Sequence, residues 1–302
     1  MGKIAFVFSG QGAQYTGMGK ELYDCSPAAK AVFDMADSIR EGTSAQCFEG
    51  DKEVLNRTVN TQPCVFTVDL AAAAAVAEKG IKPDYLAGFS LGEIAGLGFS
   101  GMLSCEDAFK LVCKRGELMD ISSNERKSTM VAVVKLTPEK VEEIASRFDD
   151  TYPVNYNSPA QTVVATAEEN ADKLCEAVKA EKGRGVKLAV SGGFHSPFMN
   201  SAAEGLGEYL KDIDINDPQI PLYSNVTAQP YAKGDDYKSM IKAQVINPVQ
   251  WQKTVENLVE KGVDTFIEVG VGKTLSGLIK KINPDVKVFN VDSKETLDAL
   301  SI

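Results

Sequence analysis

The segment YLAGFSLGE, residues 85–93, contains the most informative pattern in this chain. Its apolar first part, Tyr85 to Phe89, predicts a buried strand, and helical sequence follows through Phe109 to Asp120. The motif Gly-x-Ser-x-Gly lies between strand and helix, where a sharp turn can raise a serine hydroxyl above a sheet. Ser90 is therefore a candidate nucleophile, and an ordinary helix N-cap is the alternative interpretation.

Strand and helix patterns also alternate on both sides of this segment. Lys3 to Ser9 is an apolar strand pattern, followed by the glycine-rich loop 10–14 and by helical sequence around 20–25. Further strands, each followed by a helix, are predicted at 220–224, 265–269 and 286–291. This alternation indicates an α/β fold, and we predict a larger α/β-hydrolase-like domain with a parallel sheet.

The pattern changes between about residues 124 and 192. Here we predict strands at 130–136, 154–157, 162–166 and 186–190, with helices at 138–148 and 168–182. This βαββαβ order is typical of a ferredoxin-like unit. We therefore predict a smaller domain over 124–192, inserted into a discontinuous catalytic domain formed by 1–123 and 193–302.

Composition excludes several classes of protein. The 302 residues are 44% hydrophobic and 25% charged, as in an ordinary globular protein, and a net charge of −10 without a basic stripe argues against a nucleic-acid partner. The longest apolar run, 70–77, is far shorter than the ~20 residues that span a bilayer, and no signal-peptide pattern precedes the first strand. We expect no membrane association.

The six cysteines are scattered without a Cys-x-x-Cys pair, and the chain has one histidine, so no metal site is expected. Lone cysteines in apolar surroundings favour a reducing compartment, and we expect a cytoplasmic protein.

Two segments resemble nucleotide-binding motifs, but each lacks a required glycine. The sequence GVGKT at 270–274 lacks the glycine that a phosphate loop needs at Ile267, and Gly10-Gln11-Gly12 lacks the next dinucleotide-binding glycine at Tyr15.

A serine nucleophile needs a base, and the only histidine is His195, in a glycine-rich loop beyond the last strand of the smaller domain. An oxyanion hole needs two N–H donors. One is expected from Leu91, which follows the nucleophile, and the loop containing Gln11 is the natural source of the second. The alternatives are a surface or core histidine and a loop that only makes a tight turn.

Five motifs, taken in order along the chain, resemble those of the malonyl-CoA:acyl carrier protein transacylase family: GQGAQ (10–14), GFSLGE (88–93), Arg115-Gly116, GFHS (193–196) and NPVQW (247–251). The resemblance extends from Lys3 to Ile282. It implies ping-pong acyl transfer, in which Ser90 attacks the malonyl thioester of malonyl-CoA with His195 as general base. The phosphopantetheine thiol of acyl carrier protein then takes the acyl group for fatty acid or polyketide synthesis. No permanently bound cofactor is implied, and we expect a monomer.

The resemblance also assigns roles to two other residues. Arg115 matches the clamp for the malonyl carboxylate, although a helix-surface arginine is the alternative. Gln244 matches the glutamine that orients the catalytic histidine through a carbonyl acceptor, in place of the acid of ordinary serine hydrolases, although a glutamine on a helix surface is the alternative. Loops at 157–159 and 224–227 resemble family loops that line the cleft, but polar turns need no functional explanation, so we leave them out of the catalytic set.

The acyl carrier partner is acidic as a class, so its docking requires a local basic patch. The candidates are Lys182, Arg184 and Lys187 in one place and Lys280 with Lys281 in another. Two other functions remain open from the sequence. A serine esterase or acyl hydrolase would use the same turn with an acidic partner for His195, and a silent docking subunit would retain the fold without chemistry.

Overall fold

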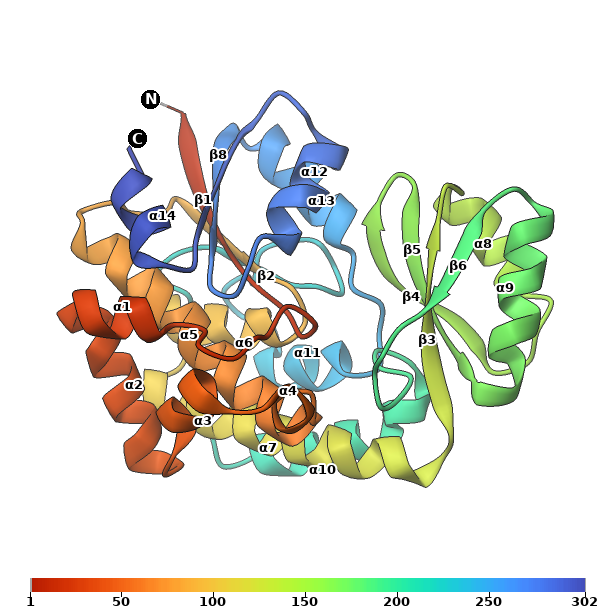
Figure 1. Cartoon of the computed structure of the whole chain (residues 1–302), viewed down its shortest axis with the longest axis horizontal. Helices are drawn as coiled ribbons and strands as arrows, with labels where there is room; N and C mark the ends of the chain where they lie inside the picture. Colours follow the sequence, from red (N-terminus) through yellow and green to blue (C-terminus); the bar gives the residue numbers. More distant parts are fainter. Residues whose placement is uncertain (1, 302) are drawn as a thin grey trace.

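The larger part of the molecule is built on a five-stranded sheet of order β7-β2-β1-β8-β9 (Figure 1). The computed structural model describes residues 2–301. All neighbouring strands of this sheet are parallel, which confirms the predicted α/β class. The strands are β1 (Lys3–Phe8), β2 (Tyr85–Gly88), β7 (Leu222–Tyr223), β8 (Val263–Val269) and β9 (Lys287–Val291).

The central strand β1 brings two distant loops together. Phe8 pairs with Gly88 on β2 and with Val269 on β8, so the carboxyl ends of these strands lie at one edge of the sheet. The loop after β1 therefore begins beside the turn that carries Ser90. Ligands of parallel α/β sheets bind at this edge.

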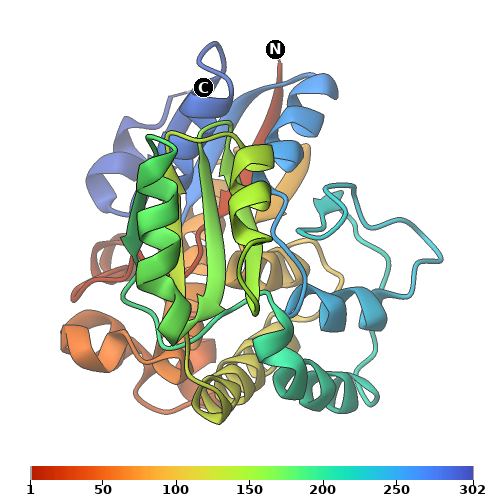
Figure 2. The ribbon, with the colours of Figure 1, turned by 90° about the vertical axis from the view of Figure 1, so that its right-hand side faces the viewer.

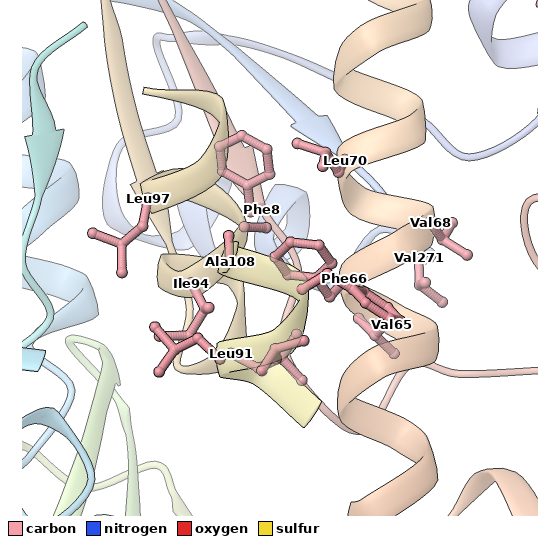
Figure 3. Close-up of a cluster of buried hydrophobic side chains, with 14 of the residues drawn as sticks. Phe8, Val65, Phe66, Val68, Leu70, Leu91, Ile94, Leu97, Ala108 and Val271 are labelled. Carbon is pink, nitrogen blue, oxygen red and sulfur yellow. The ribbon is translucent and has the colours of Figure 1, made fainter. Parts of the chain in front are cut away.

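Helices cover both faces of the parallel sheet. On one face, Phe8 packs with Phe66 and Leu70 of α5 and with Leu91 and Ile94 of α6 (Figure 3). On the other face, Val7 and Phe266 pack in a separate cluster with side chains of α12 and α13. The helices of this part are α1 (Lys20–Cys25), α2 (Pro27–Ile39), α3 (Thr43–Glu49), α4 (Lys52–Leu55), α5 (Thr58–Glu78), α6 (Leu91–Phe99), α7 (Cys105–Glu125), α10 (Asn200–Leu210), α11 (Tyr237–Gln244), α12 (Trp251–Glu260), α13 (Thr274–Ile282) and α14 (Lys294–Ala299), with the short 3-10 turn η2 (Pro197–Met199).

A four-stranded antiparallel sheet of order β4-β5-β3-β6 forms the smaller part of the molecule. Figure 2 shows helices α8 and α9 in front of one face of this sheet. This is the strand order of a ferredoxin-like βαββαβ unit and agrees with the predicted fold class. Its elements are β3 (Ser128–Val134), α8 (Pro138–Ala145), β4 (Thr151–Ser158), β5 (Gln161–Ala167), the 3-10 turn η1 (Glu168–Asn170), α9 (Ala171–Ala180) and β6 (Arg184–Lys187).

The other face of the antiparallel sheet faces the larger part. Met130 and Val163 belong to the same apolar cluster as Phe194 and Phe198, which follow β6. A main-chain bridge also joins the two parts, because Val249 donates to Val154 and accepts from Tyr156. The division at 124 and 192 stays a prediction, and α7 continues to Glu125, just beyond the first of these boundaries.

Two of the predicted strands end well before their expected last residue or are much reduced. The strand predicted at 186–190 is β6, which covers Arg184–Lys187. Leu188 still donates its N–H to Met130, but the chain leaves the sheet after it, and Leu188 to Val190 line a cavity. The strand predicted at 220–224 is reduced to Leu222–Tyr223. None of the helices within residues 2–301 is long and apolar enough to cross a membrane.

Candidate active site

Ser90 lies on a strained turn between β2 and α6. Its φ of 55° and ψ of −107° are unusual for a residue other than glycine. The flanking glycines permit this geometry: a Cβ on Gly88 would lie 2.0 Å from the carbonyl carbon of Gly92, and a Cβ on Gly92 would lie 2.4 Å from the Phe8 carbonyl oxygen. The motif thus has the strand, turn and helix expected of a nucleophile turn.

Ser90 and His195 meet although they are 105 positions apart, with Oγ 2.7 Å from Nε2. The other ring nitrogen of His195, Nδ1, lies 2.9 Å from the main-chain oxygen of Gln244. A carbonyl oxygen only accepts hydrogen bonds, so Nδ1 must carry the proton. Nε2 then has a free lone pair that accepts the serine hydroxyl, which is the arrangement of a nucleophile and its general base.

The surroundings of His195 keep its imidazole neutral. The side chain is 3% exposed, and burial together with the nearby Arg115 guanidinium lowers its pKa from 6.5 to about 4, against the opposing effect of the Gln244 carbonyl. At neutral pH the ring is therefore unprotonated and available as a base.

Two backbone N–H groups are available near the nucleophile. Leu91 begins helix α6, and Gln11 lies in the loop after β1; both line the same cavity as Ser90. Among residues 2–301, neither N–H donates a hydrogen bond to another protein group. Free N–H groups at a helix start and in a glycine-rich loop are suited to hold an oxyanion.

Arg115 is buried in α7 with 1% of its surface exposed, and it contacts the nucleophile directly. Its Nη2 donates to Ser90 Oγ at 3.1 Å and to Gln244 Oε1 at 2.9 Å, and its Nη1 donates to Gln62 Oε1 at 2.7 Å. Burial lowers the pKa of Arg115 to about 10, while Glu93 opposes this shift, so the guanidinium stays cationic at neutral pH. The surface-helix alternative for Arg115 is therefore wrong.

Gln244, at the end of α11, has two separate sets of contacts. Its main-chain oxygen accepts from His195, as the family resemblance implied. Its side-chain Nε2 donates to the main-chain oxygen of Ser90 at 2.8 Å and to Glu93 Oε2 at 3.0 Å. The side-chain contacts were not expected from the sequence.

Sequence reasoning missed other parts of this network. Asn225 accepts the Ser90 N–H on Oδ1 at 2.7 Å and donates from Nδ2 to the Gly88 oxygen at 2.5 Å, although the loop 224–227 had been left out of the site. Its position directly after a strand of the sheet was the available signal. No motif pointed to Gln62, whose Oε1 accepts from Arg115, or to Tyr231, whose hydroxyl donates to the buried Glu93.

A cavity of about 540 Å³ lies between the two parts and contains the Ser90 hydroxyl. Its described lining includes the basic side chains Lys52 and Arg115 and no aspartate or glutamate, although the whole chain has a net charge of −10. A cavity with cations and no acidic side chain favours an anionic ligand. No group of His, Cys, Asp or Glu side chains within residues 2–301 could hold a metal ion.

The two basic patches expected from the sequence lie outside this lining. In the first patch, Lys187 pairs with Asp172 at 2.7 Å. In the second, Lys280 donates to the main-chain oxygens of Pro284 and Val286. The cavity lysine is Lys52, which the sequence analysis did not select.

Comparison with known proteins identifies the family. The model of the acyl transferase domain matches residues 5–287. This chain belongs to the acyl transferase family. It is 40% identical to the malonyl CoA-acyl carrier protein transacylase of Bacillus subtilis, over 99% of this chain and 96% of that protein. A relative of the same name from Staphylococcus aureus is 39% identical, over 98% of this chain and 97% of its own length.

Solved structures of this acyl transferase family agree with the fold. A malonyl CoA-acyl carrier protein transacylase from Clostridium perfringens has a TM-score of 0.94 and 39% identity, covering 98% of this chain and 95% of that one. A malonyl-transacylase solved in complex with a type II polyketide acyl carrier protein has a TM-score of 0.94 and 32% identity, covering 98% of both chains. The resemblance to malonyl-CoA:acyl carrier protein transacylases and the predicted fold class are confirmed.

Proposed function

We propose that this chain transfers the malonyl group of malonyl-CoA to the phosphopantetheine thiol of acyl carrier protein through a malonyl-Ser90 ester, for chain extension in fatty acid or polyketide synthesis. One observation carries the proposal: Ser90 Oγ lies between His195 Nε2, at 2.7 Å, and the cationic Arg115 Nη2, at 3.1 Å. A nucleophile with a base on one side and a buried cation on the other is suited to acyl groups that carry a carboxylate.

In the first half-reaction, Ser90 Oγ attacks the thioester carbonyl carbon of malonyl-CoA while His195 Nε2 takes the hydroxyl proton. The tetrahedral intermediate collapses, the carbon–sulfur bond breaks, and the coenzyme A thiolate takes the proton from Nε2. The products are a malonyl-Ser90 ester and free coenzyme A.

The negative oxygen of the tetrahedral intermediate would be bound by the N–H groups of Leu91 and Gln11. Each such donor contributes about 3 kcal/mol to transition-state stabilisation in comparable sites. Since neither N–H is used elsewhere among residues 2–301, they are available before substrate binds.

The second half-reaction reverses these roles. His195 Nε2 takes the proton of the phosphopantetheine thiol, the sulfur attacks the ester carbonyl, and the Ser90 oxygen leaves with the proton returned from Nε2. Phosphopantetheine arrives on the carrier, so the chain itself needs no bound cofactor.

Arg115 would select acyl groups with a free carboxylate. The malonyl carboxylate is one methylene away from the carbonyl carbon that Ser90 attacks, and Arg115 already contacts Ser90 Oγ. An Arg–carboxylate pair is charge-assisted and directional, and it would be lost for an acetyl group.

The second candidate function, a serine hydrolase, would use an acid to orient His195. The partner of His195 Nδ1 is instead the main-chain oxygen of Gln244. This neutral acceptor is the feature expected of the transferase family, so we favour transfer over hydrolysis.

A labelling experiment tests the proposal. Radiolabelled malonyl-CoA should label Ser90, and the label should pass to holo acyl carrier protein but not to the apo form, which lacks the thiol. Release of the label only as free malonate would instead assign a hydrolase.

We further infer that the enzyme is a cytoplasmic monomer. All six cysteines lie within residues 2–301 as free thiols, a pattern that supports a reducing compartment. Analytical ultracentrifugation of the purified chain tests the monomer, and cell fractionation tests the location.

A further inference from the structure

Glu93 is a buried carboxylate close to the nucleophile, yet it does not line the cavity. It lies in the first turn of α6 and is 1% exposed. Its Oε1 accepts from the Tyr231 hydroxyl at 2.6 Å, and its Oε2 accepts from Gln244 Nε2 at 3.0 Å and from the Asn225 N–H at 3.1 Å. Buried charges require such partners, and here two of the three are residues that contact Ser90.

The bond to Asn225 connects Glu93 to the backbone of the nucleophile turn. The Asn225 side chain accepts the Ser90 N–H and donates to the Gly88 oxygen. Because Glu93 accepts the main-chain N–H of Asn225, it fixes the residue whose side chain holds both ends of this turn. The position of the Ser90 hydroxyl therefore depends indirectly on Glu93.

The bond to Glu93, together with the bond to the Ser90 main-chain oxygen, fixes which way the Gln244 amide faces. A carboxylate accepts but does not donate, so the NH₂ group of Gln244 must face Glu93. The amide oxygen then faces Arg115 and accepts from Nη2. The opposite orientation would direct a carbonyl at the carboxylate and an NH₂ group at the guanidinium, and neither pair can form a hydrogen bond.

We propose that Glu93 is a positioning residue that sets the preference for carboxylated acyl groups, because its acceptor oxygen orients Gln244, which in turn holds Arg115 beside Ser90. This proposal rests on the proposed malonyl transfer. Glu93 touches neither the cavity nor the nucleophile's hydroxyl, so its hydrogen bonds reach the site through Gln244 and Asn225, and its charge also favours the cationic form of Arg115.

Two substitutions separate hydrogen bonding from charge. Glu93→Gln can place its amide oxygen where Oε2 lies and its NH₂ group toward the Tyr231 oxygen, which can accept, so the contacts to Gln244 and Asn225 persist. Glu93→Met has a similar length and no strong acceptor. The matched control is Asp69→Asn, another fully buried carboxylate, whose Oδ1 makes its hydrogen bonds while Oδ2 has no partner among residues 2–301.

The readout is kcat and KM for malonyl-CoA and for acetyl-CoA in each variant. We expect Glu93→Gln and Asp69→Asn to stay within about threefold of the wild type for both substrates. In Glu93→Met, malonyl transfer should fall about a hundredfold and acetyl transfer only about tenfold, so that the malonyl-to-acetyl ratio drops about tenfold. An unchanged ratio in Glu93→Met would overturn the proposal, as would equal losses in Glu93→Gln and Glu93→Met.

A second variant serves where Glu93→Met does not fold, as judged by circular dichroism. Gln244→Met removes the link between Glu93 and Arg115 at its middle, together with the side-chain bond to the Ser90 main-chain oxygen, and keeps the main-chain oxygen that binds His195. It should lower the malonyl-to-acetyl ratio by a similar factor, and an unchanged ratio would again contradict the proposal.

The wild-type enzyme distinguishes this proposal from the proposed function. Failure of the wild type to pass label from malonyl-CoA to holo carrier would contradict the function itself. In that case, the rate at which a fluorophosphonate probe labels Ser90 would measure whether Glu93 positions the nucleophile. That rate should fall in Glu93→Met and be restored in Glu93→Gln, and equal rates in all three proteins would overturn the positioning role.

Discussion

Arg115 donates a hydrogen bond to the hydroxyl oxygen of Ser90, with Nη2 and Oγ 3.1 Å apart. One buried cation therefore lies beside Ser90 and adds to the effect of burial in lowering the pKa of His195. A substrate carboxylate bound to Arg115 would neutralise this charge when the acyl group is in place. The same guanidinium would thus link the proposed recognition of the acyl group to the chemistry at the serine.

The covalent route should depend on the Ser90 hydroxyl. We expect Ser90→Ala to lower malonyl transfer at least about a thousandfold, because the ester intermediate cannot form. Transfer assays and the absence of label on the protein measure this. Full activity in Ser90→Ala would place the chemistry elsewhere and favour a docking role for this chain.

The acyl preference should depend on Arg115. In Arg115→Ala we expect malonyl transfer to fall about a hundredfold while acetyl transfer is spared or rises, because a charge-assisted pair with the carboxylate is lost. Lys114→Ala is the control, since Lys114 is the neighbouring cation of α7 and pairs with Glu117. Equal losses for both acyl groups in Arg115→Ala would remove the assigned role.

The pH dependence of acyl transfer should reflect the lowered pKa of His195. Only the neutral imidazole accepts the serine proton, so kcat/KM for acetyl-CoA should stay level below pH 6.5 and fall only as the pH approaches about 4. In Arg115→Ala the acid limb should move to higher pH, because Arg115 contributes to the lowering. An acid limb near pH 6.5 in the wild type would show that the imidazole is not held in this environment.

Folding stability should also depend on His195. Its pKa is lower in the folded chain than in the unfolded chain, so the unfolded chain binds more protons between pH 6.5 and about 4. The stability that the neutral ring contributes is present above pH 6.5 and is lost as the pH falls toward about 4, by at most about 1.4 kcal/mol per pH unit.

Denaturant unfolding of the wild type and of His195→Gln measures this effect. The chain has a single histidine, so the difference between the two unfolding curves isolates its contribution from those of the carboxylates. We expect the free energy of unfolding of the wild type, minus that of the variant, to fall as the pH is lowered from 6.5 to about 4. A difference that does not change with pH would contradict the lowered pKa.

Asn225 should support the rate more than the binding of substrate. Asn225→Ala removes the acceptor for the Ser90 N–H and the donor to the Gly88 oxygen, so we expect kcat to fall about tenfold or more with little change in KM. Asn225→Asp keeps the acceptor and should fall between Asn225→Ala and the wild type. A change confined to KM would assign Asn225 to substrate binding instead.

The strands and the candidates for nucleophile and base were accessible from the sequence because each depends on local pattern or on scarcity. The apolar run ending at Gly88 and the two glycines around Ser90 encode the turn locally. His195 was the only histidine available. It follows β6 of the antiparallel sheet, so its meeting with Ser90 depends on the contact between the two parts of the molecule, which the sequence pattern does not show.

The network behind these residues could not be predicted in the same way. Gln62 and Tyr231 reach the site through helix packing and through a long loop, and polar residues in such places have no periodic signature. Glu93 lies within the motif 88–93, but the motif does not show that its side chain contacts Gln244, Asn225 and Tyr231. The role of Gln244 came only from family resemblance, and even that gave its main-chain contact and not its side-chain contacts with Ser90 and Glu93. The position of Lys52 in the cavity lining also depends on how α4 packs, which the sequence pattern does not show.

The bridge between Val249 and β4 has a mechanical consequence. Val249 exchanges two main-chain hydrogen bonds with the smaller part, and the segment that leads to it begins at Gln244, whose carbonyl holds the imidazole. A motion that widens the cleft by moving β4 must either break the two hydrogen bonds of Val249 or displace the carbonyl of Gln244. The width of the cleft and the orientation of the His195 imidazole are therefore coupled through the few backbone residues between Gln244 and Val249.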